Sequence, residues 1–258
     1  MGVVLTVSDL TFAYDGVNPV WSGITLEVHA GEVLSVLGPN GTGKSTLLRC
    51  MAGLHVPSNG QVTIEGNKIG NMSRKEIAQA IAFVPQMHTP VFSFTAIEVV
   101  VMGRTAHIGM FASPSANDYS VAEQAMETLG ILDLAKKSYN ETSGGERQLI
   151  LFARALAQES RILLLDEPTS HLDFGNQART LVLVRKLADQ GLAVVMTTHF
   201  PDHALGFSER TALIADGLLQ GYGITNETLD PEMLSRLYGL PVEVCTLEGG
   251  DKVCIARA

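Results

Sequence analysis

The stretch Gly38-Pro39-Asn40-Gly41-Thr42-Gly43-Lys44-Ser45 has the residue types and the spacing of a phosphate-binding loop. An apolar, partly β-branched run from Val33 to Leu37 precedes it and predicts a buried strand. The residues from Ser45 onward predict a helix that ends at Gly53. Glycines let backbone N–H groups close around phosphate oxygens, and the helix N-terminus adds a partial positive charge. The stretch therefore predicts binding of a nucleoside triphosphate, and a glycine-rich turn with a chance lysine is the weaker interpretation.

Two residues at the end of this loop carry the expected chemistry. Lys44 is placed to meet the β- and γ-phosphates, and the Ser45 hydroxyl is placed to bind Mg²⁺. The predicted nucleotide-binding residues are those of the loop and the next residue in the chain: Gly38, Pro39, Asn40, Gly41, Thr42, Gly43, Lys44, Ser45 and Thr46.

Length, composition and charge indicate a soluble, cytosolic α/β protein. The 258 residues suit one large domain, or one domain with an inserted lobe, and 46% of them are hydrophobic. The sequence has no run of about 18 uncharged apolar residues, and its start lacks the basic region of a secretory signal. The three cysteines have no metal-binding spacing, so reduced thiols are expected. The net charge of −9 disfavours a broad nucleic-acid surface.

A second stretch, Arg161-Ile162-Leu163-Leu164-Leu165-Asp166-Glu167-Pro168, is an apolar strand that ends in two acids. Asp166 lies at the carboxyl end of the strand and is placed to hold Mg²⁺ through water. Glu167 is placed to polarise an attacking water as a general base. Paired acids after a strand also favour a turn or the start of a helix. In a chain with a phosphate-binding loop, the catalytic interpretation is the stronger one.

Between these stretches lies Thr142-Ser143-Gly144-Gly145-Glu146-Arg147-Gln148. Ser143 and Glu146 have the spacing of a capping box, which predicts a helix whose exposed N-terminus attracts an anion. The order of the three motifs resembles that of the ATP-binding subunit of an ABC transporter, whose signature usually reads Leu-Ser-Gly-Gly-Gln. Thr142 and Glu146 depart mildly from that signature, whereas the central serine and two glycines are intact.

The resemblance implies that ATP joins two copies of the chain head to tail. The γ-phosphate bound to one copy would contact the signature residues of the other, so an ATP-dependent homodimer is expected. Asp173, in the stretch Ser170-His171-Leu172-Asp173, matches a loop that crosses this dimer interface. The expected contacts to the partner's nucleotide are Ser143, Gly144, Gly145 and Glu146.

The resemblance also implies three further site residues. Tyr14 looks like the aromatic residue on which adenine stacks, although a plain core or surface tyrosine is the alternative. Gln86 matches a glutamine that reaches Mg²⁺ and the attacking water, and His199 matches a histidine that contacts the γ-phosphate. The implied cofactors are ATP and Mg²⁺. The expected catalytic residues are Glu167, His199 and Gln86, and the expected metal ligands are Ser45, Gln86 and Asp166.

The resemblance covers essentially the whole chain and implies an α/β fold. This fold has a P-loop NTPase (RecA-like) core, an antiparallel β subdomain and an inserted α-helical lobe. The expected ATPase domain spans residues 1–225, with the lobe at about 87–159, and a C-terminal extension spans 226–258. Antiparallel strands are expected early in the chain, at Val4–Val7, Thr25–Val28 and Val62–Ile64, and a hairpin is expected at Thr211–Tyr222.

The segments Val101–His107 and Leu234–Val244 resemble importers of iron(III)–siderophores, haem and cobalamin, and the first segment also fits molybdate or tungstate importers. The implied function is ATP hydrolysis that powers uptake of a metal chelate. The implied partners are membrane permease subunits and, indirectly, a substrate-binding protein, with no nucleic acid. The implied location is the cytoplasmic face of the cell membrane.

The loop from His88 to Phe94 is expected at the groove that receives a permease helix, although Phe92 and Phe94 also fit the core of the lobe. Two other functions are weaker. A soluble ABC ATPase acting on nucleic acid or the ribosome is disfavoured by the single acidic cassette. A P-loop kinase or GTPase would leave Ser143 and His199 without a role.

Overall fold

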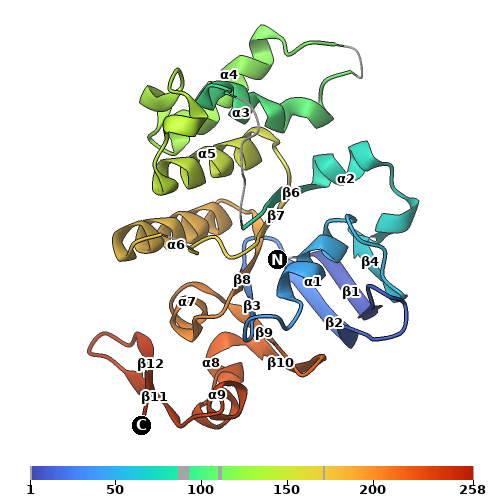
Figure 1. Ribbon diagram of the computed structural model, residues 1–258, viewed down its shortest axis with the longest axis vertical. Helices are drawn as coiled ribbons and strands as arrows, with labels where there is room; N and C mark the ends of the chain where they lie inside the picture. The colour runs from blue at the N-terminus through green and yellow to red at the C-terminus, as the bar shows by residue number, and fades with distance from the viewer. Residues whose placement is uncertain (1, 87–92, 110–111, 171, 258) are drawn as a thin grey trace.

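The computed structural model describes residues 2–86, 93–109, 112–170 and 172–257 (Figure 1). Its central element is a six-stranded sheet in the order β10-β9-β3-β8-β7-β6, in which β10 runs antiparallel to β9 and the other pairs are parallel. Parallel strands end at the same edge of a sheet, so the loops after β3, β7 and β8 gather there. The strands are β3 (Val33–Leu37), β6 (Ile81–Val84), β7 (Ile162–Leu165), β8 (Ala193–Thr198), β9 (Arg210–Ala215) and β10 (Leu218–Ile224).

The two faces of this sheet pack against different layers, because successive side chains of a strand point to opposite faces. Leu163 and Leu165 of β7 belong to the apolar cluster shared with the helical lobe. Ile162 and Leu164 belong to the cluster shared with the antiparallel sheet. All four side chains are buried, so β7 is covered on both faces, as its continuous apolar sequence predicts.

The amino-terminal part forms a four-stranded antiparallel sheet in the order β2-β1-β4-β5, drawn in blue and cyan in Figure 1. Helix α1 (Lys44–Met51) shares an apolar cluster with this sheet through Leu47, Leu48 and Met51. A capping box formed by Ser73 and Glu76 opens α2 (Arg74–Ala80), as the spacing Ser73-Arg74-Lys75-Glu76 predicts. The strands are β1 (Val3–Phe12), β2 (Trp21–His29), β4 (Asn59–Ile64) and β5 (Asn67–Lys68), and a 3₁₀ turn, η1 (Ile69–Asn71), follows.

The helical lobe lies at the upper end of the molecule in Figure 1. Its backbones pack closely at Gly103, where an added Cβ would lie 2.1 Å from the carbonyl oxygen of Arg154. The buried Arg104 guanidinium lies 3.4 Å from Asp118 and 2.6 Å from Glu159, which ties the lobe together. Its helices are α3 (Ala96–Val101), α4 (Ala116–Thr128) and α5 (Gly144–Ala157), with 3₁₀ turns η2 (Met102–Ala106), η3 (Leu132–Leu134) and η4 (Tyr139–Glu141).

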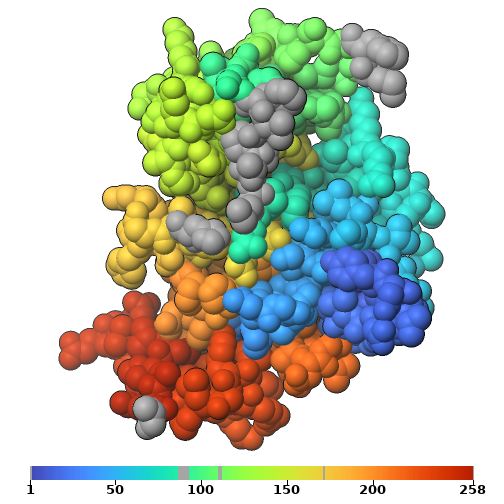
Figure 2. All heavy atoms as spheres, in the orientation of Figure 1, coloured from blue at the N-terminus to red at the C-terminus, as the bar shows by residue number. Residues whose placement is uncertain are grey.

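The C-terminal part packs on β3 and β9 of the central sheet, at the opposite end of the long axis from the lobe (Figure 2). Leu229, Leu234 and Val242 share an apolar cluster with Leu37 of β3 and Leu213 of β9. This cluster joins residues on both sides of position 225. The domain boundary that is expected at this position from the sequence therefore stays a prediction. The remaining elements are α6 (Phe174–Asp189), α7 (Pro201–Phe207), α8 (Thr225–Thr228), α9 (Pro231–Tyr238), β11 (Val242–Thr246) and β12 (Lys252–Ala256).

The expected α/β fold class is confirmed, with a parallel core sheet, an antiparallel subdomain and a helical lobe. The strands predicted at Val4–Val7 and Thr25–Val28 are parts of longer strands, β1 and β2. Across the residues that the structure describes, none of the helices combines the length and the apolar character needed to span a bilayer.

Candidate functional site

The phosphate-binding loop joins β3 to α1, and its glycines are fixed by close packing. A Cβ added at Gly38 would lie 2.2 Å from the carbonyl oxygen of Ile214, so this position excludes a side chain. Gly43 has a φ of 88°, which other residues adopt only with strain. The Trp21 indole N–H donates a hydrogen bond of 3.2 Å to the Gly43 carbonyl and holds the loop against β2. The loop is therefore a preformed turn.

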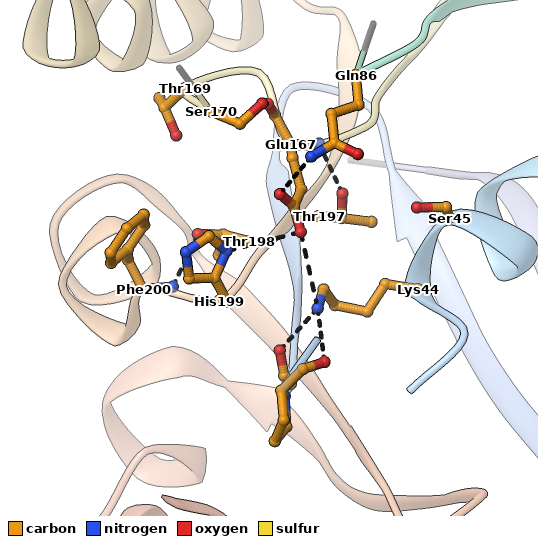
Figure 3. Close-up of polar contacts among 12 residues, drawn as sticks. Lys44, Ser45, Gln86, Glu167, Thr169, Ser170, Thr197, Thr198, His199 and Phe200 are labelled. Atoms are coloured by element: carbon orange, nitrogen blue, oxygen red, sulfur yellow. Dashed lines mark hydrogen bonds and ion pairs between the residues drawn. The ribbon is translucent and has the colours of Figure 1, made fainter. Parts of the chain in front are cut away.

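The Lys44 side chain lies inside this turn and is only 5% exposed. Its ammonium donates hydrogen bonds to the carbonyl oxygens of Gly38 at 2.7 Å and Pro39 at 2.9 Å. The same group lies 3.9 Å from a carboxylate oxygen of Glu167 (Figure 3). Burial lowers the pKa of Lys44, and the negative charges of Glu167 and Asp166 partly oppose that shift. A buried cation at this point can meet an anionic phosphate.

Asp166 follows β7 and is also buried, with 3% of its surface exposed. Its carboxylate accepts a hydrogen bond of 2.8 Å from the Ser45 hydroxyl at the start of α1. Mg²⁺ prefers oxygen ligands and is usually held by one or two carboxylates together with substrate phosphates. The oxygens of Ser45 and Asp166 fit that preference, and the described residues contain no cluster of three or more His, Cys, Asp or Glu side chains that would form an all-protein cage.

Glu167 is the point on which three other side chains converge. The Gln86 amide donates a hydrogen bond of 2.9 Å to one carboxylate oxygen of Glu167. Lys44 and the His199 ring approach the other oxygen, the Nδ1 atom of His199 at 3.6 Å. Figure 3 shows these side chains around a single point, although they come from four separate segments of the chain. The arrangement can hold a water beside a phosphate and accept its proton.

The Glu167 backbone has a φ of 46°, in the left-handed region. This conformation costs a residue other than glycine on the order of 1 kcal/mol, so its surroundings must stabilise it. Ser170 contributes by donating two hydrogen bonds to the Glu167 carbonyl oxygen, from its backbone N–H at 3.0 Å and its hydroxyl at 2.9 Å.

A pocket of about 470 Å³ opens above the phosphate-binding loop and contains most of the predicted nucleotide-binding residues. Tyr14 lies at its rim, 66% exposed, and its hydroxyl lies 2.9 Å from the Thr46 hydroxyl. Val20 and Arg49 also line the pocket, and the sequence patterns did not identify them. The lining residues are Tyr14, Val20, Asn40, Gly41, Gly43, Lys44, Ser45, Thr46, Arg49, Gln86 and Glu167.

The signature residues do not line this pocket within one chain. Ser143 is the exposed N-cap of α5, and the predicted capping box with Glu146 is present, with hydrogen bonds of 2.8 and 3.3 Å. Hydrogen bonds from the Ser143 backbone and the Lys137 ammonium lower the pKa of Glu146. The ammonium of Lys137 lies 3.0 Å from Glu146 and balances its charge. Gly144 is exposed, and Gly145 packs against Asn176.

Asp173 caps α6 by accepting a hydrogen bond of 2.9 Å from the backbone N–H of Asn176. This hydrogen bond is the main cause of a lowered pKa at Asp173. The side chain of Asp173 therefore has a structural role within its own chain, and the expected contact across a dimer stays a prediction. The neighbouring His171 and the predicted permease contact Phe92 lie outside the described residues.

The loop of His199 is attached to the C-terminal part of the chain. The Tyr238 hydroxyl of α9 donates a hydrogen bond of 2.9 Å to the backbone oxygen of His199. The Asp202 carboxylate, three residues after His199, accepts a hydrogen bond of 2.7 Å from the backbone N–H of Cys254. Burial strongly raises the pKa of Tyr238, so this hydroxyl stays protonated and remains a donor. The sequence patterns did not identify either contact, because they join residues 39 and 52 positions apart.

Comparison with known proteins places this architecture in a family. The sequence pattern of a family described as "ABC transporter" matches residues 21–170. The molybdate import ATP-binding protein MolC of Haemophilus influenzae is 40% identical over 94% of this chain and 90% of its own length. The hemin import ATP-binding protein HmuV of Rhodococcus jostii is 37% identical over 94% and 82%. A solved structure of a transporter assigned to the metal-chelate ABC type, in an inward-facing conformation, has a TM-score of 0.89 and 36% identity and covers 100% of this chain and 98% of that one.

Proposed function

This chain belongs to the ABC transporter family as an ATP-binding subunit, an ATPase coupled to transport, and we propose that it powers uptake of a metal chelate through membrane permease subunits. The observation that carries the catalytic part of this proposal is the convergence of Lys44, Gln86 and His199 on the carboxylate of Glu167. These four residues are also the ones for which the sequence predicts a part in binding or hydrolysing ATP.

In the proposed reaction, water attacks the γ-phosphorus of ATP and the bond to the β-phosphate oxygen breaks. Glu167 accepts the proton of the attacking water as the general base. Its carboxylate is 14% exposed, so a water can reach it, and the Gln86 amide holds it in place. Lys44 stabilises the negative charge of the β- and γ-phosphates. His199 approaches the same carboxylate oxygen as Lys44 and is proposed to contact the γ-phosphate. The products are ADP and inorganic phosphate.

Mg²⁺ is proposed to be held by Ser45, Asp166 and Gln86 together with the phosphates of ATP, and it would neutralise charge that develops on the γ-phosphate. The hydroxyl of Ser45 and the carboxylate of Asp166 already lie within 2.8 Å of each other. The Gln86 side-chain oxygen is available, because the amide nitrogen makes the contact to Glu167.

A second copy of the chain is proposed to complete the site. The exposed N-terminus of α5, with Ser143 and Gly144, presents backbone N–H groups and a partial positive charge to the surface. These groups suit the γ-phosphate of an ATP bound to the other copy. Because Lys137 balances the charge of Glu146, the acidic departure from the usual signature does not preclude an anion at this helix end.

The permease is proposed to dock in a groove on the helical lobe with a volume of about 380 Å³. Phe94, Met102 and Tyr119 line it and are each between 36% and 40% exposed. Partly exposed aromatic residues and methionine are common anchors of protein interfaces. Gln86 directly precedes the segment 87–92 and Phe94 lies two residues after it, so the catalytic pocket and the groove are close in sequence.

The proposed substrate is an iron(III)–siderophore, haem or cobalamin, on the resemblance of the segments around Gly103 and Leu240 to importers of these chelates. Similarity to a hemin importer subunit and to a transporter assigned to the metal-chelate type supports this proposal. Molybdate is the second candidate, because a molybdate importer subunit is 40% identical over 94% of the chain. The location at the cytoplasmic face of a membrane and the indirect partnership with a substrate-binding protein belong to the same proposal.

Uptake by the complete complex tests the function. The tagged chain would be purified from its native membrane, the accompanying permease identified, and the complex placed in vesicles with ATP on the side of this subunit. The proposal predicts ATP-dependent uptake of an iron chelate, haem or cobalamin. Uptake of molybdate alone would select the second candidate, and recovery of the chain with nucleic acid and no membrane protein would contradict both.

A further inference from the structure

A threonine hydroxyl connects the two acids at the end of β7. Thr197 lies on β8 in the register position next to Asp166, because Leu165 pairs with Met196. Its Oγ1 atom accepts a hydrogen bond of 2.7 Å from the backbone N–H of Glu167. The same hydroxyl donates a hydrogen bond of 2.9 Å to a carboxylate oxygen of Asp166.

These two hydrogen bonds occupy the hydroxyl of Thr197. Thr197 is 0% exposed, so water does not compete for it. A hydroxyl has one proton to donate, and here that proton goes to Asp166. The Glu167 N–H belongs to a half-buried residue with a left-handed φ of 46°, and Thr197 is its partner.

The direction of the Glu167 side chain depends on this contact. Ser170 holds the carbonyl side of the Glu167 peptide, and Thr197 holds the N–H side. Backbone atoms on both sides of a left-handed residue are thus fixed by hydroxyl groups. Removal of one of them lets Glu167 relax toward an ordinary backbone conformation, which would turn its carboxylate away from Lys44 and His199.

We propose that Thr197 is a positioning residue for ATP hydrolysis, which holds the backbone of Glu167 and the carboxylate of Asp166 in their working positions. This inference rests on the proposed function, in which Glu167 is the general base. Thr197 itself lies beneath the acids and does not line the nucleotide pocket. Its loss is therefore expected to change kcat much more than the KM for ATP.

Three substitutions separate the hydroxyl from the shape of the side chain. Thr197→Ser keeps the oxygen, Thr197→Val keeps the shape, and Thr197→Ala differs from Thr197→Ser by that single oxygen atom. The expected kcat of the serine variant is within about 3-fold of the parental value. The valine and alanine variants are expected to lose roughly 10- to 100-fold in kcat, the scale of a hydrogen bond to a charged group, with KM changed by less than about 3-fold.

A matched control comes from another buried threonine. Thr211 on β9 is also 0% exposed, and its hydroxyl lies 2.9 Å from that of Thr225, away from both acids. Thr211→Val should lower the unfolding temperature and leave kcat within about 3-fold of parental. If Thr197→Val is too unstable to purify, the comparison of the alanine and serine variants decides. Equal kcat in those two variants would overturn the inference.

A double variant distinguishes failure of this inference from failure of the proposed function. In the Glu167→Gln background, Thr197→Val should lower the residual rate by a smaller factor than in the parental background, because one of the two groups that it positions has lost its chemistry and only Asp166 still depends on it. An inactive Glu167→Gln variant together with a fully active Thr197→Val variant would reject the role of Thr197 alone. A Glu167→Gln variant with the parental rate would instead reject the general base and with it the proposed mechanism.

Discussion

The side-chain amide of Gln86 donates a hydrogen bond of 2.9 Å to the carboxylate of Glu167, across 81 positions of the sequence. Gln86 follows β6 and Glu167 follows β7, and these strands are parallel neighbours. Because Gln86 is also the last residue before the segment that leads to the helical lobe, this contact links the lobe to the acid proposed to activate water.

The first prediction concerns this contact. Gln86→Ala removes the donor to Glu167, so kcat for ATP hydrolysis should fall about 10-fold or more, as for a lost hydrogen bond to a charged group. A steady-state phosphate-release assay measures the change. Gln79→Ala is the control, because the side-chain amide of Gln79 donates a hydrogen bond of 3.1 Å to the backbone oxygen of Ala106 and lies outside the nucleotide pocket. Equal rates in the two variants would contradict a role for Gln86.

The second prediction concerns the pH dependence of nucleotide affinity. Burial lowers the pKa of Lys44 from its ordinary value of 10.5. As pH rises through the lowered pKa, the ammonium loses its charge, and affinity for ATP should fall at a lower pH than for an exposed lysine. Since the bound triphosphate favours the charged form, binding in this range should take up protons.

The same shift has a defined sign for stability. The folded state disfavours the charged form of Lys44, so the contribution of Lys44 to the free energy of folding is unfavourable below its folded pKa. This unfavourable contribution is lost as the pH rises above the folded pKa toward the ordinary value of 10.5.

The predicted loss of affinity at alkaline pH is measured by calorimetric titration of ATP at several pH values. Lys44→Ala should bind weakly at every pH, and an equally steep alkaline loss of affinity in that variant would assign the effect to another group.

The third prediction concerns the proposed dimer. In the Glu167→Gln background, Mg-ATP should convert monomers to dimers, which light scattering detects. Ser143→Asp keeps a good N-cap for α5 but places a carboxylate where the partner's γ-phosphate is proposed to lie, so dimers should be lost. The control is Ser73→Asp, because Ser73 caps α2 in the same kind of capping box. Dimers in both variants, or in neither, would contradict the shared site.

The fourth prediction concerns the C-terminal part of the chain. Leu234 of α9 is 0% exposed and shares an apolar cluster with Leu37, the last residue of the strand before the phosphate-binding loop. Leu234→Ala should lower the free energy of unfolding by about 2–5 kcal/mol. Leu247→Ala is the control, because Leu247 is 50% exposed. Chemical unfolding measures both, and an unaffected midpoint in Leu234→Ala would show that the C-terminal part folds separately.

Much of this fold could be predicted because its elements are encoded locally. The strand before the loop and the capping boxes at Ser73 and Ser143 follow from short patterns, and the structure has them at those positions. The acids after β7 were likewise expected at the end of a buried strand. Short-range spacing predicts Lys44 at the start of a helix and Asp166 at the end of a strand, and the structure has Lys44 at the first position of α1 and Asp166 directly after β7.

Contacts between distant segments could not be predicted in this way. Thr197 meets both acids only because β7 and β8 pair in one particular register. Likewise, the bond from Tyr238 to His199 depends on how α9 packs on the core. Gly103 and Arg104 lie in the segment Val101–His107, whose resemblance to known importers suggests a substrate class. The structure shows that they pack and bond the helices of the lobe together, which explains these residues without any substrate.

The most direct test of the account is the rate of Mg-ATP hydrolysis by the parental chain and by Glu167→Gln. The substitution keeps the shape of the side chain and removes its negative charge, so ATP should still bind with near-parental affinity. The account predicts a fall in kcat of roughly 10²–10⁴-fold, the scale of a lost general base. A Glu167→Gln variant that hydrolyses ATP at the parental rate would contradict the assignment of Glu167 as the base.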